Sequence, residues 1–358
     1  MHVRMFLTAT AACAAFPLTA QVTPATPPAA VVEAKLPFDK DQTAGVVAKL
    51  ATSLEDNFVF PEVGKAYAER LRGQLAADAY ASFPDGQAFA EKVTADLQAV
   101  HKDGHLRLRV VPKDSRGGPG AERRGPPSSS AVVKSGWIAD RVAYIRFDGF
   151  PGNDATIADL KKFVAAHRDA ATLIIDARAH RGGGLAEMDI LFPELFASPT
   201  TLVAMDTREA VDRREGNPIR DAALRKIAAP EGVVRREHFV TPAANQGGLS
   251  RAKIYLLTAN RTASAGEHLS LSLKRTKRAT LVGETTRGAG HYGDVNALPH
   301  GFEVFIPVGR TFDPDTNEGW ETVGVKPHVE VPADKALDEA LKLAGVKVGG
   351  DAALAAIK

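Results

Sequence analysis

The chain has 358 residues, 44% hydrophobic and 25% charged, a composition that excludes a wholly disordered or collagen-like protein. Its 45 Lys and Arg residues nearly balance 43 Asp and Glu residues, and the net charge of +2 argues against a nucleic-acid binder that depends on phosphate contacts. Cys13 is the only cysteine, so an intramolecular disulfide and a cysteine-based zinc site are excluded too.

The N-terminal segment has the pattern of a secretory signal peptide. Met1–Arg4 carries one fixed positive charge, Met5–Ala15 is apolar, and small residues lead to Ala20. The apolar run is too short to span a bilayer. We therefore predict that residues 1–20 are a signal peptide cleaved after Ala20. The mature chain is expected to be periplasmic or secreted, with no integral membrane segment; a lipid anchor at Cys13 is the open alternative.

A small helical bundle is expected next, over residues 41–112, after a flexible lead of Pro, Ala and Val at 21–40. In three segments apolar residues recur about every four positions, which places them on one face of each helix. These residues are Val46, Leu50 and Leu54; Val63, Tyr67, Leu71 and Leu75; and Phe89, Val93 and Leu97. Asp85 is a plausible N-cap for the third helix. Residues 113–135, rich in Gly, Pro, Ser and Arg, are predicted to be a linker.

Strands and helices alternate over residues 136–332, which predicts a mostly parallel sheet with helices on both faces. The expected strands are 141–147, 172–176, 201–206, 253–258, 279–283 and 303–309, and the expected helices are 153–167, 185–196 and 263–274. A charged, Arg-rich insertion without clear periodicity, residues 210–250, suggests a functional loop or cover. Residues 333–358 are expected to form a C-terminal helix and tail.

Ser264 stands in the string Thr-Ala-Ser-Ala-Gly-Glu between an expected strand and an expected helix. Open α/β folds carry their sites at the carboxyl ends of strands, so the hydroxyl is well placed for chemistry. The backbone N–H of Ala265, at the helix N-terminus, would face a developing oxyanion. The structural alternative is that Thr262 or Ser264 only caps the helix, with Glu267 completing a capping box.

Three further strings follow strands. The glycine run 182–184 would let the backbone approach a bound group closely, although no phosphate-binding fingerprint is present and a plain turn is the alternative. The Gly-punctuated loop 283–292 ends near His291, and the string 320–327 contains Glu321. Each of these two is an ordinary turn if taken alone.

Together and in this order, the strings resemble the tail-specific, or C-terminal processing, serine peptidases, in the branch of the interphotoreceptor retinoid-binding protein repeats. The resemblance covers about residues 41–331. It rests on Asn57–Pro61, Asp103–Leu106, Asp-x-Arg-x-x-x-Gly-Gly at 176–183, Thr262–Glu267, Gly283–Gly288 and Trp-Glu-x-x-Gly-Val-x-Pro at 320–327. It implies a helical N-terminal bundle followed by a ClpP/crotonase-like α/β sheet domain. A PDZ domain, which many members carry, does not fit into residues 113–130.

The resemblance implies that Ser264 is the nucleophile and that the N–H groups of Ala265 and Gly183 form the oxyanion hole. A serine hydroxyl needs an adjacent base. The Ser–Lys branch has its lysine where this chain has Ala289, so that dyad is not available. The tricorn-like branch uses a histidine backed by a serine and a glutamate, and His105 and Glu321 match two of those positions.

Gly104 replaces the serine of that tetrad. We therefore expect His105, oriented by Glu321, to be the base, with His291 as the second candidate. The predicted function is that of an exported serine peptidase acting on a peptide or protein through an acyl-enzyme, without metal or cofactor. The alternatives are a non-catalytic protein for an apolar, lipid-like or retinoid-like ligand, and a purely structural or partner-binding module. An intact serine with two candidate histidines favours the enzyme.

The signal-peptide pattern generates the first testable prediction. N-terminal sequencing of the protein purified from its native host is expected to begin at Gln21, because cleavage follows the small residue Ala20. A native preparation whose chain still begins at Met1 would contradict export by this route.

Overall fold

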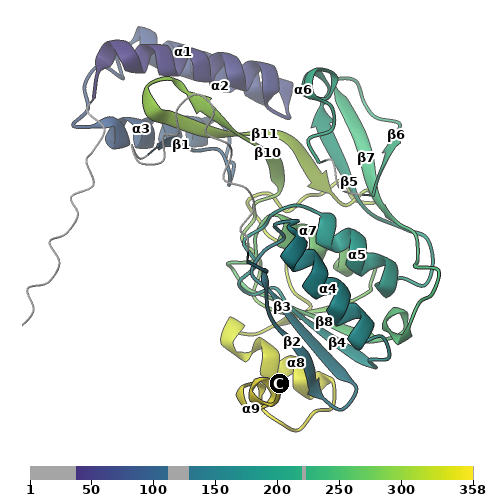
Figure 1. Cartoon of the computed structure of the whole chain (residues 1–358). Helices are drawn as coiled ribbons and strands as arrows, with labels where there is room; N and C mark the ends of the chain where they lie inside the picture. Colours follow the sequence, from purple (N-terminus) through teal and green to yellow (C-terminus); the bar gives the residue numbers. More distant parts are fainter. Residues whose placement is uncertain (1–37, 112–128, 220–222, 358) are drawn as a thin grey trace, which may run out of the picture. The chain divides into compact units, whose positions relative to one another are not determined.

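The computed structural model describes residues 38–111, 129–219 and 223–357 (Figure 1). The predicted signal peptide, Cys13, nearly all of the predicted lead and most of the predicted linker lie outside the described residues. All of the described residues belong to one compact unit, Leu36–Lys358. No helix in this part of the chain is long and apolar enough to cross a membrane.

The three predicted N-terminal helices are present as α1 (Lys40–Asn57), α2 (Pro61–Ala76) and α3 (Gly86–Val100). Local chemistry explains where they begin. The Asp39 carboxylate accepts the N–H of Asp41 at 3.0 Å, and Pro61 occupies the first turn of α2, where its missing N–H costs nothing. The carboxylate of Asp85 accepts the N–H of Ala88 at 2.9 Å, so this predicted N-cap is confirmed.

The apolar faces of these helices pack on strands from both ends of the chain. Strand β1 (Leu108–Val110) pairs antiparallel with β11 (Phe302–Phe312), and β10 (His291–Leu298) forms a hairpin with β11. Figure 1 shows the hairpin lying along the helices. One core therefore joins the helices to β1 and the hairpin, and it includes Val46, Leu50, Leu54, Leu108, Val304 and Ile306. The hairpin's first strand was not among the expected strands, and its first two residues fall in the segment 283–292 that was predicted to be a loop.

Two of the expected strands, 201–206 and 303–309, lie in a second, antiparallel sheet, which corrects the prediction of one mostly parallel sheet over residues 136–332. The other four expected strands lie in a mostly parallel sheet with the strand order β12-β9-β8-β4-β3-β2. Its strands are β2 (Val132–Ala139), β3 (Val142–Phe147), β4 (Thr172–Asp176), β8 (Lys253–Thr258), β9 (Thr280–Gly283) and β12 (Val329–Glu330). Only β2 runs antiparallel to its neighbour. The predicted linker, residues 113–135, extends too far toward the C-terminus, because β2 begins at Val132. Strand β2 is rich in polar and small residues and is paired on one side only, so it lacks the apolar run of the inner strands.

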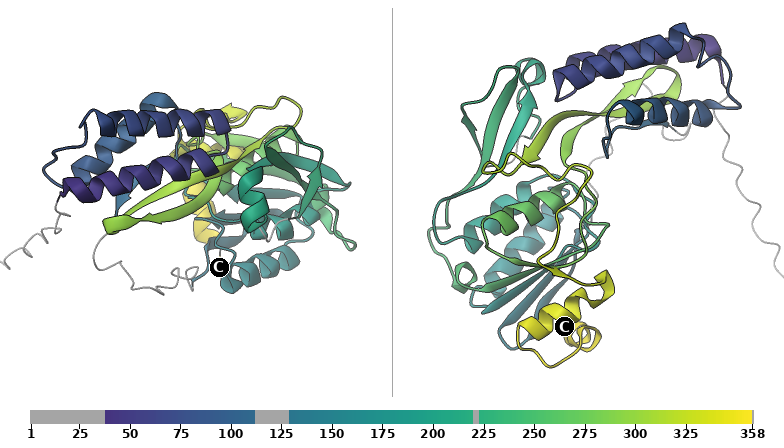
Figure 2. Two further views of the ribbon diagram at one scale, coloured as in Figure 1. Left: turned by 90° about the horizontal axis from the view of Figure 1, so that it is seen from above. Right: turned by 180° about the vertical axis from the view of Figure 1, so that it is seen from behind.

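Helices cover both faces of this sheet (Figure 2). Side chains alternate along β3, so Ala143 and Ile145 face one core and Val142 and Tyr144 face another. The first core contains apolar side chains of α4 (Asp154–Ala166), α5 (Ala186–Leu195) and α7 (Ala265–Arg275), and the second contains those of α8 (Ala336–Leu343) and α9 (Gly350–Ala356). Short 3-10 helices lie at Gly248–Ser250, Pro299–Gly301 and Ala333–Lys335.

The 210–250 insertion, expected to be a functional loop or cover because it shows no clear periodicity, contains regular structure. It contains most of α6 (Glu209–Glu215) together with β6 (Leu224–Ile227) and β7 (Val233–Val240). Strand β7 pairs antiparallel with β5 (Thr200–Arg208), which extends the sheet that contains β1 and β11. The arginines interrupt the alternation of apolar residues that would have predicted these strands. They form ion pairs with carboxylates of neighbouring segments, as Arg235 does, whose Nε lies 2.6 Å from Asp206 Oδ1.

Candidate active site

Ser264 occupies a strained turn between β8 and α7. Its backbone has φ +54° and ψ −117°, a region that residues with a Cβ rarely adopt. Such a conformation costs about 1–3 kcal/mol and is found preferentially at functional sites. A sharp strand-to-helix turn of this kind also lifts a serine hydroxyl out of the sheet edge, as the sequence pattern predicted.

The glycine run permits the neighbouring loop to approach Ser264. At Gly182, φ is +107°, and an added Cβ would lie 2.8 Å from Ser264 Cβ and 3.3 Å from its Oγ. At Gly183, φ is +130°, and an added Cβ would lie only 2.0 Å from the carbonyl oxygen of Phe150. Glycine is therefore required at both positions by space and by backbone conformation.

Two backbone N–H groups near Ser264 have no acceptor among the described residues. The carbonyl of Gly182 accepts the N–H of Phe150, and the N–H of Gly184 donates to the carbonyl of Phe150. The N–H of Gly183 takes part in neither hydrogen bond. Ala265 is the first residue of α7, so its N–H has no partner within the helix. Both residues line a cavity of about 440 Å³ together with Ser264. These are the N–H groups of the two residues that the resemblance implies as oxyanion donors.

His291 and Ala289 line the same cavity. Ala289 is buried, and the described residues that line this cavity include no lysine. Of the two histidines considered from the sequence, the structure thus brings His291 to the cavity of Ser264. His291 is the first residue of β10, on the hairpin that packs against the N-terminal helices.

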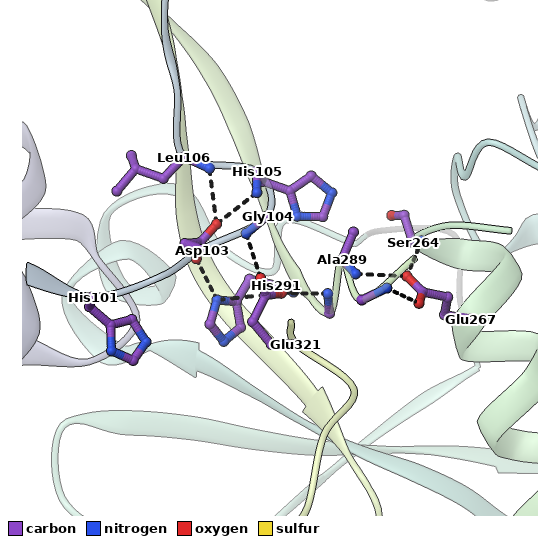
Figure 3. Close-up of polar contacts among 12 residues, drawn as sticks. His101, Asp103, Gly104, His105, Leu106, Ser264, Glu267, Ala289, His291 and Glu321 are labelled. Atoms are coloured by element: carbon purple, nitrogen blue, oxygen red, sulfur yellow. Dashed lines mark hydrogen bonds and ion pairs between the residues drawn. The ribbon is translucent and has the colours of Figure 1, made fainter. Parts of the chain in front are cut away.

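A carboxylate from the N-terminal region orients His291. Asp103 Oδ2 lies 2.6 Å from His291 Nδ1, and both side chains are buried (Figure 3). Asp103 Oδ1 accepts the N–H groups of His105 at 2.8 Å and Leu106 at 2.9 Å. Burial alone would raise the pKa of Asp103, but the hydrogen bond and charge of His291, with these two N–H groups, lower the pKa of its carboxyl below the usual range.

Glu321 connects the two loops that carry the histidines. Its Oε1 accepts the N–H of Gly104 at 2.5 Å, and its Oε2 accepts the N–H groups of Gly290 at 2.5 Å and His291 at 3.0 Å. Glu321 Oε2 also lies 3.9 Å from His291 Nδ1. The carboxylate thus positions backbone on both sides of the Asp103–His291 pair.

His105, the base preferred from the sequence, is placed elsewhere. Its ring stacks on Phe305 of β11 with centroids 4.9 Å apart, and it is not among the residues that line the cavity of Ser264. Its Nδ1 atom is buried without a hydrogen-bond partner in the described structure. Burial lowers the pKa of His105 despite the nearby charges of Asp103 and Glu321. In Figure 3 the His291 ring points toward Asp103 and the His105 ring points away from it. The geometry therefore favours His291.

Glu267 holds the His291 loop against the helix that begins after Ser264. Its Oε2 accepts the N–H groups of Ser264 and Ala289, each at 2.9 Å. Its Oε1 accepts the hydroxyl of Thr286 and the N–H of Gly288, each at 2.6 Å. The capping role considered from the sequence is therefore present in part, since Glu267 accepts the N–H of Ser264. It does not compete with a catalytic role for the serine.

Sequence reasoning missed Asp103 as a functional residue and assigned Glu267 only a capping role. A signal for Asp103 was present, because Asp-Gly-His-Leu was one of the strings that carried the resemblance. The ligand atoms of Asp103, His291 and Glu321 lie within 4.8 Å of one another, a spacing that suits a metal ion. However, Asp103 Oδ1 and both carboxylate oxygens of Glu321 already accept backbone N–H groups, and Asp103 Oδ2 accepts the ring N–H of His291.

Comparison with known sequences decides the family. The profile of Peptidase family S41 matches residues 141–331, more than half of the chain, and that of the N-terminal domain of Peptidase_S41 in eukaryotic IRBP matches residues 38–136. The chain belongs to peptidase family S41.

One relative is the chloroplastic C-terminal processing peptidase of Tetradesmus obliquus, 27% identical over 207 residues. The match covers 57% of this chain and 38% of the relative, so the chain spans well under half of that protein's length. Among solved structures, the photosystem II D1 C-terminal processing protease is 16% identical with a TM-score of 0.50, covering 88% of this chain and 99% of that one.

The tricorn protease is 14% identical with a TM-score of 0.51, covering 88% of this chain and 36% of that one. At these identities the two structures establish a shared fold. They confirm the predicted architecture, in which N-terminal helices precede an α/β sheet domain.

The two adjacent glycines generate a testable prediction about the oxyanion donors. Gly183→Ala is expected to reduce kcat/KM on the order of 10²–10³-fold, because the new Cβ collides with Phe150 and displaces the N–H. Gly184→Ala is the matched control: an added Cβ there meets its nearest atom at 3.9 Å, so activity should stay near that of the wild type. Steady-state kinetics on both variants decide it, and equal losses would contradict the assignment.

Proposed function

We propose that this S41 family member is an exported serine peptidase that hydrolyses peptide bonds through an acyl-enzyme on Ser264. One observation carries the proposal: a serine in a strained strand-to-helix turn shares a cavity with two unpartnered N–H groups and a carboxylate-bound histidine. Export is supported by the signal-peptide pattern of residues 1–20, and a peptide substrate by the family.

The Asp103–His291 pair gives the histidine the tautomer that a general base needs. An ionised Asp103 accepts the Nδ1–H of His291, so Nε2 carries the free electron pair. In the proposed reaction Nε2 takes the proton of the Ser264 hydroxyl as Oγ attacks the substrate carbonyl. The resulting oxyanion receives hydrogen bonds from the N–H groups of Gly183 and Ala265.

Collapse of the tetrahedral intermediate breaks the C–N bond and transfers the proton from His291 to the leaving amine, which leaves an ester on Ser264. A water molecule then attacks this ester while His291 takes its proton. The second intermediate releases the carboxylic acid, and the proton returns to Ser264 Oγ. Atoms and protons balance over the two steps, and only groups described above take part.

The nucleophile is tested by covalent labelling. Ser264→Ala is expected to lose detectable peptide hydrolysis and all labelling by a peptidyl organophosphonate, because Oγ is the atom that forms the bond. Circular dichroism and thermal unfolding of the variant should resemble those of the wild type. Labelling of the Ser264→Ala protein at wild-type stoichiometry, located by peptide mass spectrometry, would exclude Ser264 as nucleophile.

The base is tested by comparing the two histidines. His291→Ala is expected to lose nearly as much activity as Ser264→Ala, since members of such a unit act together. Asp103→Asn keeps an oxygen for the N–H groups of His105 and Leu106 but removes the acceptor for His291, and kcat should fall on the order of 10⁴-fold.

His105→Ala is the comparison that can reverse the assignment. We expect it to lower stability, because a ring stacked on Phe305 is lost, while the folded fraction still turns over substrate. Burial lowers the pKa of His105 below the usual histidine value of about 6.5, so its ring stays unprotonated at lower pH. If His105 were the base, activity would therefore persist at pH values below that value. An inactive, folded His105→Ala beside an active His291→Ala would assign the base to His105.

A further inference from the structure

Three titratable side chains form a second hydrogen-bonded chain, and this chain ends at the cavity of Ser264. Asp189 of α5 lies 2.9 Å from His238 Nε2 of β7, through its Oδ1 atom. His238 Nδ1 in turn lies 2.9 Å from His268 Nε2 of α7. The two rings are 1% and 3% exposed respectively, so water does not separate them. The mechanism proposed above uses none of these three residues.

The carboxylate fixes the direction of every hydrogen bond in this chain. Asp189 can only accept, so His238 donates its Nε2–H to it and keeps Nδ1 as an acceptor. His268 must then donate its Nε2–H to His238. Burial and the neighbouring His238 lower the pKa of His268 well below its ordinary value, so the ring is neutral and its remaining nitrogen, Nδ1, carries an electron pair.

His268 lies one helical turn after Ser264 and lines the same cavity. Its Nδ1 has no hydrogen-bond partner among the described residues. This atom is also not completely shielded from solvent. Four of the other lining residues are largely apolar, namely Leu185, Met205, Ile219 and Trp320, and the buried indole N–H of Trp320 has no hydrogen-bond partner in the described structure. The Asp189–His238–His268 chain thus supplies one fixed acceptor to an apolar surface beside the nucleophile.

We propose that His268 Nδ1 selects substrates whose side chain next to the cleaved bond is compact and carries a hydroxyl group, as threonine does. The inference rests on the proposed peptidase function and specifies its substrate class. The methyl group of such a side chain would pack on the apolar lining, and its hydroxyl would donate to Nδ1. Asp189 and His238 are positioning residues in this proposal, because they act on the substrate only through His268.

The lining disfavours the charged donors of lysine and arginine. Asp294 is the only carboxylate among the described residues that line the cavity, and it is exposed. A cationic side chain directed at His268 would therefore be desolvated against apolar groups without a carboxylate to pair with. Valine is the informative competitor, because it has the shape of threonine and lacks the donor. A bound valine would leave Nδ1 without a partner, which the site penalises.

The test compares matched peptides. Internally quenched peptides that differ only by Thr or Val on either side of the cleaved bond, located by mass spectrometry, are assayed with the wild type. The kcat/KM ratio is expected to favour Thr on the order of tenfold on one of the two sides. His268→Phe keeps an aromatic ring but removes the acceptor, and the ratio should fall to about one. His268→Gln, which can donate to His238 and still accept, should retain part of the preference.

Two further variants separate specificity from general damage. Asp189→Asn removes the fixed direction of the chain and is expected to reduce the Thr preference. His300→Asn changes an exposed histidine at the turn between β10 and β11 and should leave the ratio at the wild-type value. A ratio of one or below in the wild type, or an unchanged ratio in His268→Phe, would overturn the proposal. So would loss of organophosphonate labelling in a folded His268→Phe, because it would assign His268 to catalysis.

A binding measurement keeps this test separate from that of the function. Calorimetric titration of the Ser264→Ala protein with the product peptides that end or begin with Thr or Val needs no turnover. If the wild type hydrolyses nothing and is not labelled, the peptidase proposal fails while a tighter Thr peptide still supports the subsite. Turnover without any Thr preference, in kinetics and in binding, contradicts the subsite and leaves the peptidase proposal standing.

Discussion

The candidate site depends on one buried carboxylate, that of Glu267. Burial raises the pKa of this group, and a charge there would be costly without compensation. Four hydrogen bonds provide it: one from Ser264 and three from residues of the 286–289 segment. The same contacts attach the loop that leads to His291 to the N-terminus of α7. The relative placement of nucleophile and candidate base is therefore a consequence of satisfying one buried acid.

The N-terminal helices complete the site. Asp103 follows α3, whereas His291 lies at the start of the β10–β11 hairpin, 188 positions further along the chain. The two meet because the helices and the hairpin bury their apolar faces in one core. Glu321 adds hydrogen bonds to Gly104 and Gly290, one on each side. Hydrophobic burial brings these segments together, and the carboxylates then set the geometry of their polar groups.

Strain and close approach are concentrated on the opposite side of the cavity. Ser264 has a positive φ, and Gly182 and Gly183 have conformations and spacings that a side chain would disturb. Beneath them His180 is fully buried, and its Nδ1 accepts the N–H of Gly182 at 3.1 Å. Burial lowers the pKa of His180 to about 3, so the ring remains a neutral acceptor for this loop. Ser264 and the glycine run thus share the cavity with the candidate base, which lies on a separate hairpin.

The sequence by itself determined the features that depend on neighbouring residues. Helical periodicity and Asp85 predicted α3, the apolar run 172–176 predicted β4, and the string around Ser264 predicted a strand-to-helix turn. The order of the motifs also identified the family. Local patterns could not determine which distant segments meet. The Arg-rich strands β6 and β7 showed no apolar alternation, because their arginines pair with carboxylates on other segments.

Only the tertiary structure decided which histidine faces Ser264. His105 and His291 are equally polar in the sequence, and the family pattern favoured His105. In the folded chain, Phe305 of β11 covers the His105 ring, while the buried Asp103 orients His291 at the cavity. That choice depends on how β11 pairs with β1 and β10, a register set by long-range burial of apolar side chains. A linear pattern records which groups a chain possesses, but their partners depend on packing between segments that lie far apart in the sequence, 188 positions in the case of Asp103 and His291.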